Sequence, residues 1–215
     1  MHLLFDLDGT LTDSRPGIFN SFRHALEENG LPFPADEDLL WCIGPPIQES
    51  LKKLIGPDSQ HLFEPALMKY RERYGTIGLF ENETYPGIED ALKETRRLGY
   101  THHVATSKPE VFAKRIISHF GLGRYFDSVN GSELDGTRTN KAELIAHILT
   151  HRKIDPAQAV MIGDREHDMI GAAMNGIPAI GALWGYGTVR ELMESGATLC
   201  ARTPQLLAEL IVTLD

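Results

Sequence analysis

Several features that would assign a protein to a class at once are missing or scarce in this sequence of 215 residues. No apolar run approaches the roughly 18 residues that a membrane-spanning helix needs. Only two cysteines occur, Cys42 and Cys200, and they lack the spacing of metal ligands. The first residues carry no basic segment and reach Asp6 at once, which is unlike a signal peptide. We therefore expect no membrane association and a reducing, cytoplasmic setting.

Basic clusters are also missing. The formal net charge is -9, and no run of Lys and Arg or stripe of basic and aromatic residues stands out. This argues against a nucleic-acid partner, whose backbone is recognised by clustered positive charge. A small anion can still bind, because a local site can be positive on an acidic protein. With 42% hydrophobic residues the chain can form a core without disulfides or a structural metal. Whether it is a monomer or a dimer is left open.

What the chain does contain is a change of pattern near residue 84. Residues 15–83 read as helices with apolar faces, punctuated by Gly44-Pro45-Pro46 and Gly56-Pro57. Residues 84–215 alternate short apolar strands with helices, which predicts a parallel sheet with helices on both faces. We therefore predict an α/β fold with a Rossmann-like parallel sheet in residues 1–14 and 84–215. A small α-helical cap domain, residues 15–83, is inserted after the first strand. The strands are predicted at residues 2–5, 101–106, 126–130, 159–162 and 178–182.

The strongest chemical signal is Asp6-Leu7-Asp8-Gly9-Thr10, directly after the apolar run at residues 2–5. A carboxylate at a strand end projects into the crevice where parallel sheets bind ligands. Residues i and i+2 face the same side, so Asp8 can reach the same place as Asp6. Gly9 permits the sharp exit of the chain. The simple structural alternative, two acids capping a strand before a turn, is common but less favoured at this position.

Two further segments are weaker alone. Thr106 and Ser107 end a predicted strand, where they could bind an anion or merely cap the next helix. Lys141 opens a predicted helix, where an acid would suit the helix dipole better than a base. A buried cation at this position could instead offset the charge of a phosphate and two aspartates. A surface lysine is the alternative.

The last segment is Gly163-Asp164-Arg165-Glu166-His167-Asp168, after the apolar strand at residues 159–162. Magnesium prefers hard oxygen ligands and keeps several waters, so acids at a strand end suit it. A glycine-aspartate turn into a helix would also produce this pattern. The four segments are more informative together than apart, because each lies where a strand ends or a helix begins.

The order of these segments resembles the haloacid dehalogenase-like hydrolase superfamily, in its phosphatase branch with a helical cap. The resemblance implies that Asp6 is the nucleophile and forms an aspartyl-phosphate. It implies that Asp8 acts as general acid and then as general base. Thr106, Ser107 and Lys141 are implied to bind the phosphoryl group.

The resemblance also implies a Mg²⁺ cofactor. Asp6, Asp164 and the backbone carbonyl of Asp8 would hold the ion, with Asp168 orienting water or Lys141 from outside the first set of ligands. In relatives that carry a cap, a loop between cap helices lines the pocket, and the corresponding residues here are Gly44 and Pro45. The end of one helix and the start of the next would produce the same Gly44-Pro45-Pro46 sequence.

The sequence leaves the substrate open. We expect a small phosphorylated metabolite, with phosphoglycolate phosphatase-like specificity as the first choice and 5'-nucleotidase or pyrophosphatase activity as the alternative. A phosphosugar mutase would use the same two acids. A phosphate-responsive binding module is the non-enzymatic alternative. Dehalogenation is disfavoured, because that branch uses one aspartate and no metal, which leaves Asp8 and Lys141 unexplained.

Overall fold

The computed structural model describes residues 1–35 and 39–215. These residues form two compact units, one of Met1–Thr12 with Thr84–Asp215 and one of Asp13–Glu83. Strands β2 (Thr12–Asp13) and β3 (Glu83–Thr84) pair as a two-stranded sheet where the chain passes from one unit to the other. No helix within the described ranges combines the length and the apolar character that crossing a bilayer requires.

The larger unit is built on a six-stranded parallel sheet in the order β5-β4-β1-β6-β7-β8. This confirms the predicted parallel sheet of an α/β fold. Its central strand β1 is short, buried and apolar, as expected for a strand covered on both faces. The strands are β1 (His2–Phe5), β4 (Thr101–Pro109), β5 (Ser128–Ser132), β6 (Ala159–Gly163), β7 (Ala179–Ala182) and β8 (Leu199–Ala201).

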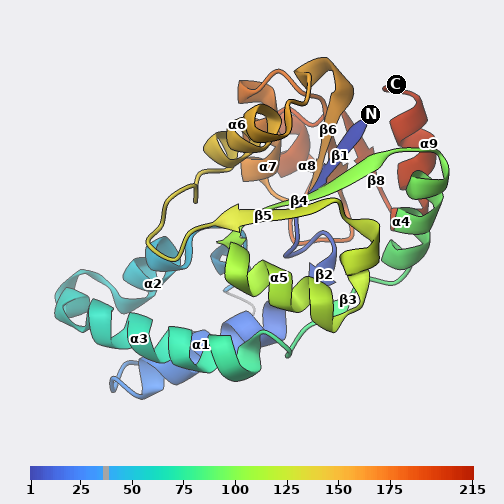
Figure 1. The fold of residues 1–215 in the computed structure, drawn as a ribbon. Coiled ribbons are helices and arrows are strands. Elements are labelled where there is room, and N and C mark those ends of the chain that lie inside the picture. The colour runs from blue at the N-terminus through green and yellow to red at the C-terminus, as the bar shows by residue number, and fades with distance from the viewer. Residues whose placement is uncertain (36–38) are drawn as a thin grey trace. The chain divides into compact units, whose positions relative to one another are not determined.

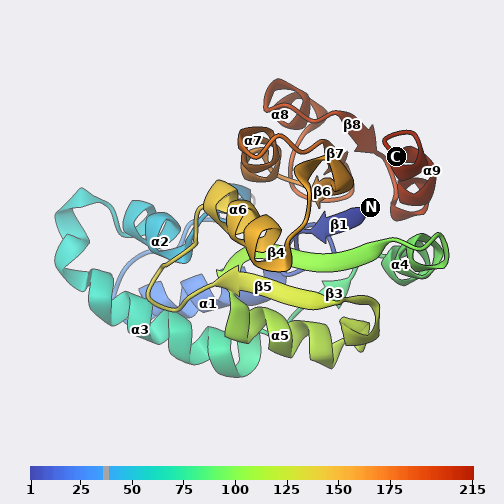
Figure 2. The same cartoon turned by 45° about the horizontal axis from the view of Figure 1, so that its top comes forward.

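Helices cover both faces of this sheet, as Figures 1 and 2 show. One layer contains α6 (Lys141–Arg152), α7 (Glu166–Met174) and α8 (Val189–Glu194). The other contains α4 (Ile88–Arg97), α5 (Glu110–His119) and α9 (Leu207–Val212). The strand order runs outward from β1 to β4 and β5, and then from β6 to β7 and β8 on the other side. Right-handed crossovers in opposite directions place helices on opposite faces. The reversal beside β1 is therefore the point where ligands are expected to bind.

Apolar side chains of the central strands hold the sheet to α6 and α7. Leu4, Ala105 and Met161, from three adjacent strands, belong to one cluster with Leu144 and Ile148 of α6. All five are excluded from solvent. Burial of each leucine or isoleucine side chain contributes about 1.5–3 kcal/mol relative to exposure. The packing fixes the strand ends, and with them the residues that follow each strand.

The smaller unit is helical, with α1 (Arg15–Glu27), α2 (Ile47–Ile55) and α3 (Phe63–Arg73) as its main elements. Short helical segments η2 (Leu40–Cys42), η3 (Pro57–Leu62) and η4 (Tyr74–Gly78) connect or extend them. Phe22 of α1 packs on Tyr70 of α3, with ring centroids 4.8 Å apart. Arg73, the last residue of α3, and Glu81, which follows η4, form an ion pair at 2.8 Å that links these two segments.

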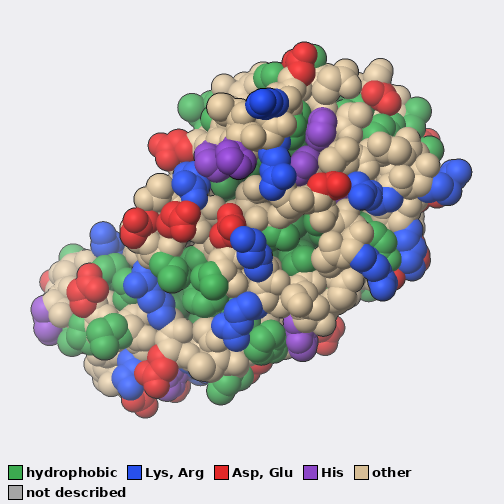
Figure 3. Space-filling view, viewed as in Figure 1, with side chains coloured by type: hydrophobic (Ala, Val, Ile, Leu, Met, Phe, Trp, Pro, Cys, Tyr) green, Lys and Arg blue, Asp and Glu red, His purple; other side chains and the backbone are tan. Residues whose placement is uncertain are grey.

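Charged side chains of both signs are mixed on the face of the molecule that Figure 3 shows. On the face shown in Figure 3, basic and acidic side chains are interspersed with apolar ones, and no continuous basic stripe is seen there.

Candidate active site

Two aspartates lie at the carboxyl ends of neighbouring strands in the middle of the sheet. Asp6 directly follows β1, and its backbone N–H donates to the Ile162 carbonyl oxygen at 2.9 Å. Asp164 directly follows β6, which pairs in parallel with β1. Parallel neighbours end at the same edge, so both carboxylates reach the crevice where α/β sheets of this kind bind ligands.

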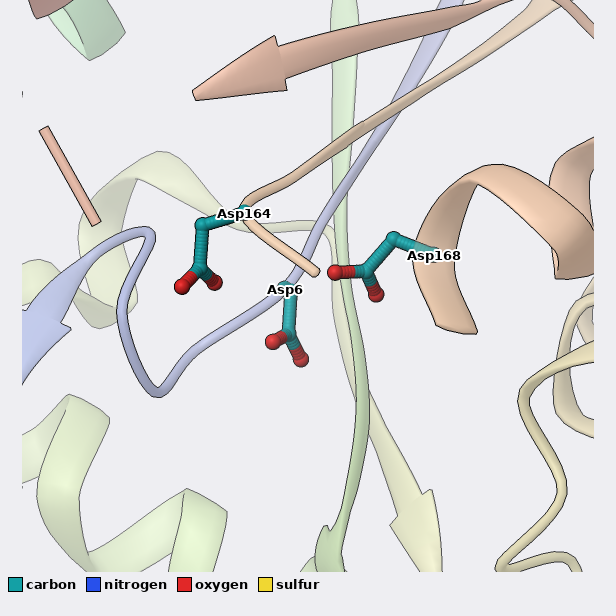
Figure 4. A group of neighbouring side chains, drawn as sticks. All are labelled: Asp6, Asp164 and Asp168. Atoms are coloured by element: carbon teal, nitrogen blue, oxygen red, sulfur yellow. The ribbon is translucent and has the colours of Figure 1, made fainter. Parts of the chain in front are cut away.

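Asp168, in the first turn of α7, completes a cluster of three buried carboxylates. One oxygen from each of Asp6, Asp164 and Asp168 lies within 4.8 Å of the others. Figure 4 shows the three side chains converging from the end of β1, the loop after β6 and the start of α7. Asp168 lies four residues after Asp164 in the chain. The first turn of α7 brings its carboxylate close to the Asp164 carboxylate.

Lys141 inserts an ammonium group between two of these carboxylates. Its Nζ lies 2.8 Å from Asp6 Oδ1 and 2.7 Å from Asp168 Oδ1, and it donates to the Ala105 carbonyl oxygen at 2.9 Å. Lys141 is the first residue of α6, directly after the N-cap residue Asn140. Burial lowers the pKa of Lys141, but the Asp168 and Asp6 carboxylates outweigh burial and raise it overall. The two carboxylates therefore favour the charged form of this buried side chain.

Close backbone approach shapes the surroundings of Asp164. A Cβ added to Gly9, which has a φ of +86°, would lie 2.2 Å from Asp164 Oδ2. A Cβ added to Gly185 would lie 2.4 Å from Asp164 Cβ. The Asp164 carboxylate accepts hydrogen bonds from the Tyr186 N–H at 2.9 Å and from the Thr10 hydroxyl at 3.1 Å. The loop after β1 and the turn after β7 therefore hold this carboxylate from two sides.

The structure adds Lys108, a residue of the site that the sequence analysis missed. Its Nζ lies 2.8 Å from Asp8 Oδ1 and 2.7 Å from Asp8 Oδ2. Both side chains are largely buried, with 6% and 12% of their surfaces exposed. A signal was available: Lys108 follows Thr106 by two residues in a strand, so the two share a face. The predicted strand ends at residue 106, and the sequence pattern gives Lys108 no role of its own.

Thr106 and Ser107 lie in the second half of β4, next to β1 in the sheet. Thr106 is buried, and its hydroxyl oxygen accepts the Lys108 N–H at 3.3 Å. The carbonyl oxygen of Ser107 accepts the Ser132 hydroxyl at 2.8 Å. Thr106 and Ser107 come directly after Ala105, whose carbonyl oxygen accepts a hydrogen bond from Lys141 Nζ. Their predicted contacts with a phosphoryl group stay predictions.

The charges at this site suit an additional cation. Four aspartates are matched by two lysines, which leaves a formal excess of two negative charges among largely buried groups. Burial raises the pKa of Asp164 well above its usual value, and Asp168 and Asp6 raise it further. Burial also raises the pKa of Asp6, although Lys141 opposes it. A divalent cation would relieve this repulsion, and carboxylate oxygens are the donors that a hard cation prefers. The residues therefore fit Mg²⁺.

Gly44 and Pro45 belong to the smaller unit, in the loop between η2 and α2. Gly44 has a φ of +104°, a conformation that favours glycine. Their role in substrate contact stays a prediction.

Known proteins are similar to this chain over most of its length. A model of the haloacid dehalogenase-like hydrolase family matches residues 3–182. The chain is 45% identical over 191 residues to a 5'-nucleotidase of Pseudomonas aeruginosa, covering 89% of this chain and 86% of the relative. It is 40% identical to the tyrosine-protein kinase PtkA of Mycobacterium tuberculosis, covering 92% and 67%. Relatives named phosphoglycolate phosphatase are 26–29% identical.

A solved structure supports the same grouping. The crystal structure of a predicted phosphatase from Clostridium acetobutylicum is 38% identical and superposes with a TM-score of 0.92. The match covers 99% of this chain and 98% of that one. The similarity thus extends over both units of the chain.

Proposed function

The chain belongs to the haloacid dehalogenase-like hydrolase family, and we propose that it is a Mg²⁺-dependent phosphatase that hydrolyses a small phosphate monoester through an aspartyl-phosphate on Asp6. The observation that carries this proposal is that one oxygen from each of Asp6, Asp164 and Asp168 lies within 4.8 Å of the others, while Lys141 is hydrogen-bonded to Asp6 and ion-paired with Asp168. A carboxylate nucleophile, a metal-type acid cluster and a buried cation are what phosphoryl transfer to a side chain requires.

In the first step, an Asp6 oxygen attacks phosphorus and the bond to the ester oxygen breaks. Asp8 gives its proton to the departing oxygen, so that an alcohol leaves and Asp8 becomes a carboxylate. Splitting the reaction at a covalent intermediate replaces one difficult displacement by two easier ones.

In the second step, water attacks the phosphorus of the aspartyl-phosphate. Asp8 takes a proton from this water as the P–O bond to Asp6 breaks, which releases inorganic phosphate and restores both acids. Lys141, with Thr106 and Ser107 from β4, would bind the phosphoryl oxygens through both steps. Lys141 is suited to this because it is a fixed buried cation.

We assign Asp6, Asp164 and the backbone carbonyl of Asp8 as the Mg²⁺ ligands. When bound, the ion lowers the repulsion between the Asp6 carboxylate and the phosphoryl group. Asp168 would orient the site rather than bind the ion. Its Oδ1 faces the Lys141 ammonium group at 2.7 Å and its Oδ2 accepts the Arg165 N–H at 3.1 Å, so its carboxylate is already paired with a cation, whereas the Asp164 carboxylate accepts from the neutral Tyr186 and Thr10 donors.

The partner in this proposal is a small phosphorylated metabolite. The 45% identity to a 5'-nucleotidase makes nucleoside 5'-monophosphates the first substrates to test, with phosphoglycolate, pyrophosphate and sugar phosphates beside them. Gly44 and Pro45 would contact the organic part of the substrate. The two free cysteines, Cys42 and Cys200, support a reducing, cytoplasmic location.

The decisive experiment measures phosphate release from p-nitrophenyl phosphate with Mg²⁺. The wild-type chain should turn over many times, and Asp6→Asn should lower kcat by roughly 10³-fold or more while the circular dichroism spectrum stays unchanged. Asp90→Asn is the matched control, since the Asp90 side chain is 79% exposed on α4 and should be silent.

Chelation by EDTA should stop the reaction, and Mg²⁺ should restore it. Near-native phosphate release by Asp6→Asn would refute the nucleophile, and indifference to EDTA would refute the metal. A single turnover would favour a binding module. An isomerised sugar phosphate without free phosphate would favour a mutase, and phosphate transfer from ATP to a tyrosine peptide would favour a kinase.

A further inference from the structure

Lys108 is a second buried lysine at this site, and it contacts a different acid from Lys141. Lys141 lies against Asp6 and Asp168, whereas Lys108 Nζ lies 2.8 Å and 2.7 Å from the two oxygens of Asp8. The two lysines thus contact different aspartates. The proposed function gives Lys141 a role but uses Lys108 nowhere.

The backbone that carries Lys108 is held in place. Its N–H donates to the Thr106 hydroxyl oxygen at 3.3 Å, and the preceding carbonyl, of Ser107, accepts the Ser132 hydroxyl at 2.8 Å. A Cβ added to Gly131 would lie 2.5 Å from the Lys108 carbonyl oxygen, so β5 passes very close to this point. The ammonium group therefore extends toward Asp8 from a fixed strand.

Asp8 needs such a restraint. It lies two residues after Asp6, and a cation held by Asp6 and Asp164 would attract its carboxylate as well. An Asp8 side chain drawn to the metal could neither give its proton to the leaving oxygen in the first step nor accept one from water in the second. An ammonium group that contacts both carboxylate oxygens at 2.7–2.8 Å opposes that rotation, because the contact is charge-assisted and largely buried.

We propose that Lys108 is a positioning residue that holds the Asp8 side chain in one orientation, in which it can exchange a proton with the leaving group and with water. This proposal rests on the proposed function, because it gives Lys108 its effect through the acid-base role of Asp8. It predicts that loss of Lys108 harms proton transfer rather than substrate binding.

The test compares two esters in Lys108→Met. An alkyl phosphate such as glycerol phosphate has a poor leaving group that must be protonated, whereas p-nitrophenol leaves readily without a proton. We expect kcat to fall by about 10²-fold for the alkyl ester and by less than about tenfold for p-nitrophenyl phosphate, with KM changed little. Lys114→Met is the matched control, because the Lys114 side chain is 59% exposed on α5.

A double variant separates positioning from a direct role. If Lys108 acts through Asp8, Lys108→Met should have little further effect in an Asp8→Asn background. Lys108→Arg keeps the charge with a different shape and should lie between wild type and Lys108→Met in the ratio of the two kcat values. Full rescue by arginine in every measurement would instead indicate a purely structural ion pair. If Lys108→Met does not fold, the same comparison is made with Lys108→Arg, alone and in the Asp8→Asn background, and its ratio of the two kcat values tests the positioning role.

The outcomes distinguish this inference from the proposed function. If the wild-type chain hydrolyses both esters and Lys108→Met does so at equal rates, the inference is wrong and the phosphatase stands. A raised KM with unchanged kcat would make Lys108 a substrate contact, and independent effects in the double variant would also overturn positioning. If the wild-type chain hydrolyses neither ester with Mg²⁺ present, the proposed function fails and the inference falls with it.

Discussion

At the residue scale, two properties of position 9 favour glycine: a positive φ and the close approach of Asp164. Their effects on stability and on activity can be measured separately. Its φ of +86° is unfavourable for a residue with a Cβ, which costs about 1–2 kcal/mol. In addition, a Cβ there would lie 2.2 Å from Asp164 Oδ2. We expect Gly9→Ala to destabilise the fold and to lower kcat on the order of 10- to 100-fold, because Asp164 must move.

Gly99 provides the matched control for this variant. It has a φ of +90°, and a Cβ there meets no atom within 4 Å. Gly99→Ala should therefore cost about the same conformational energy and leave phosphatase activity unchanged. Urea unfolding and kcat measured on both variants check the prediction. Equal losses of activity in the two would show that the closeness of Gly9 to Asp164 is unimportant.

The sequence could identify the acids of the site because each follows a recognisable apolar strand. Asp6 and Asp164 come directly after the apolar runs that form β1 and β6, so their places at strand ends could be predicted, whereas the adjacency of β1 and β6 that brings them together comes from the structure. The contact of Lys108 with Asp8 could not be predicted in the same way. It depends on where β4 ends and on the course of one long side chain, and neither is encoded by a local pattern.

At the element scale, the N-terminus of α6 sets the position of Lys141. The side chain of Asn140 accepts hydrogen bonds from the Ala142 and Glu143 N–H groups at 2.9 Å and 3.3 Å. Asn140→Ala should lower the free energy of unfolding by about 1 kcal/mol through loss of this cap. Because Lys141 is the first residue of the helix, we also expect a several-fold lower kcat, whereas Asn140→Asp should retain both.

Asp155 is the appropriate comparison for this cap. Its side chain accepts the Ala157 N–H at 3.0 Å at the start of η6 (Pro156–Gln158), before β6 rather than after it. Asp155→Ala should therefore lower stability without lowering kcat. Thermal unfolding and initial rates measured on the two variants test this. An activity loss in Asp155→Ala equal to that in Asn140→Ala would mean that general destabilisation explains both.

Elements with strong periodic or apolar patterns were predicted, and short or irregular ones were not. The strand at residues 159–162 was expected from an uninterrupted apolar run and is observed as β6. The three-residue edge strand β8 and the six-residue helix α8 were missed, since each is too short to show a period. The predicted strand at residues 101–106 continues to Pro109, because a register shift lets Pro109 pair with Ser132 of β5.

At the scale of the whole molecule, the alternation of strands and helices was sufficient to predict the parallel sheet and its two helical layers. The reason is physical: right-handed crossovers leave few ways to connect such elements. The order of the strands within the sheet could not be predicted from the sequence and comes from the structure.

Two histidines of β4, His102 and His103, are buried and make the stability of this sheet depend on pH.

Both histidines are held neutral in the folded chain. Burial lowers the pKa of His102 to about 4, with Arg96 contributing, and burial lowers the pKa of His103 to about 4, with His2 contributing. In the unfolded chain both take up a proton near pH 6.5. The unfolded state therefore binds more protons between pH 6.5 and pH 4, so stability is complete above pH 6.5 and falls as the pH drops toward 4.

We expect this loss to reach on the order of 3 kcal/mol for His102 at pH 4. His102→Phe removes the titration and suits the aromatic neighbours Phe5 and Phe126. Thr95, which contacts the His102 ring, keeps its hydrogen bond to the Ala91 carbonyl oxygen at 2.8 Å.

Urea unfolding between pH 7 and pH 4 should show a shallower pH dependence in His102→Phe than in the wild-type chain. His147→Gln, on the exposed side of α6, should leave the wild-type slope unchanged. If the slopes of His102→Phe and the wild-type chain coincide, the acid sensitivity originates elsewhere in the fold. A shallower slope in His102→Phe alone would assign it to a neutral histidine enclosed between the sheet and α4.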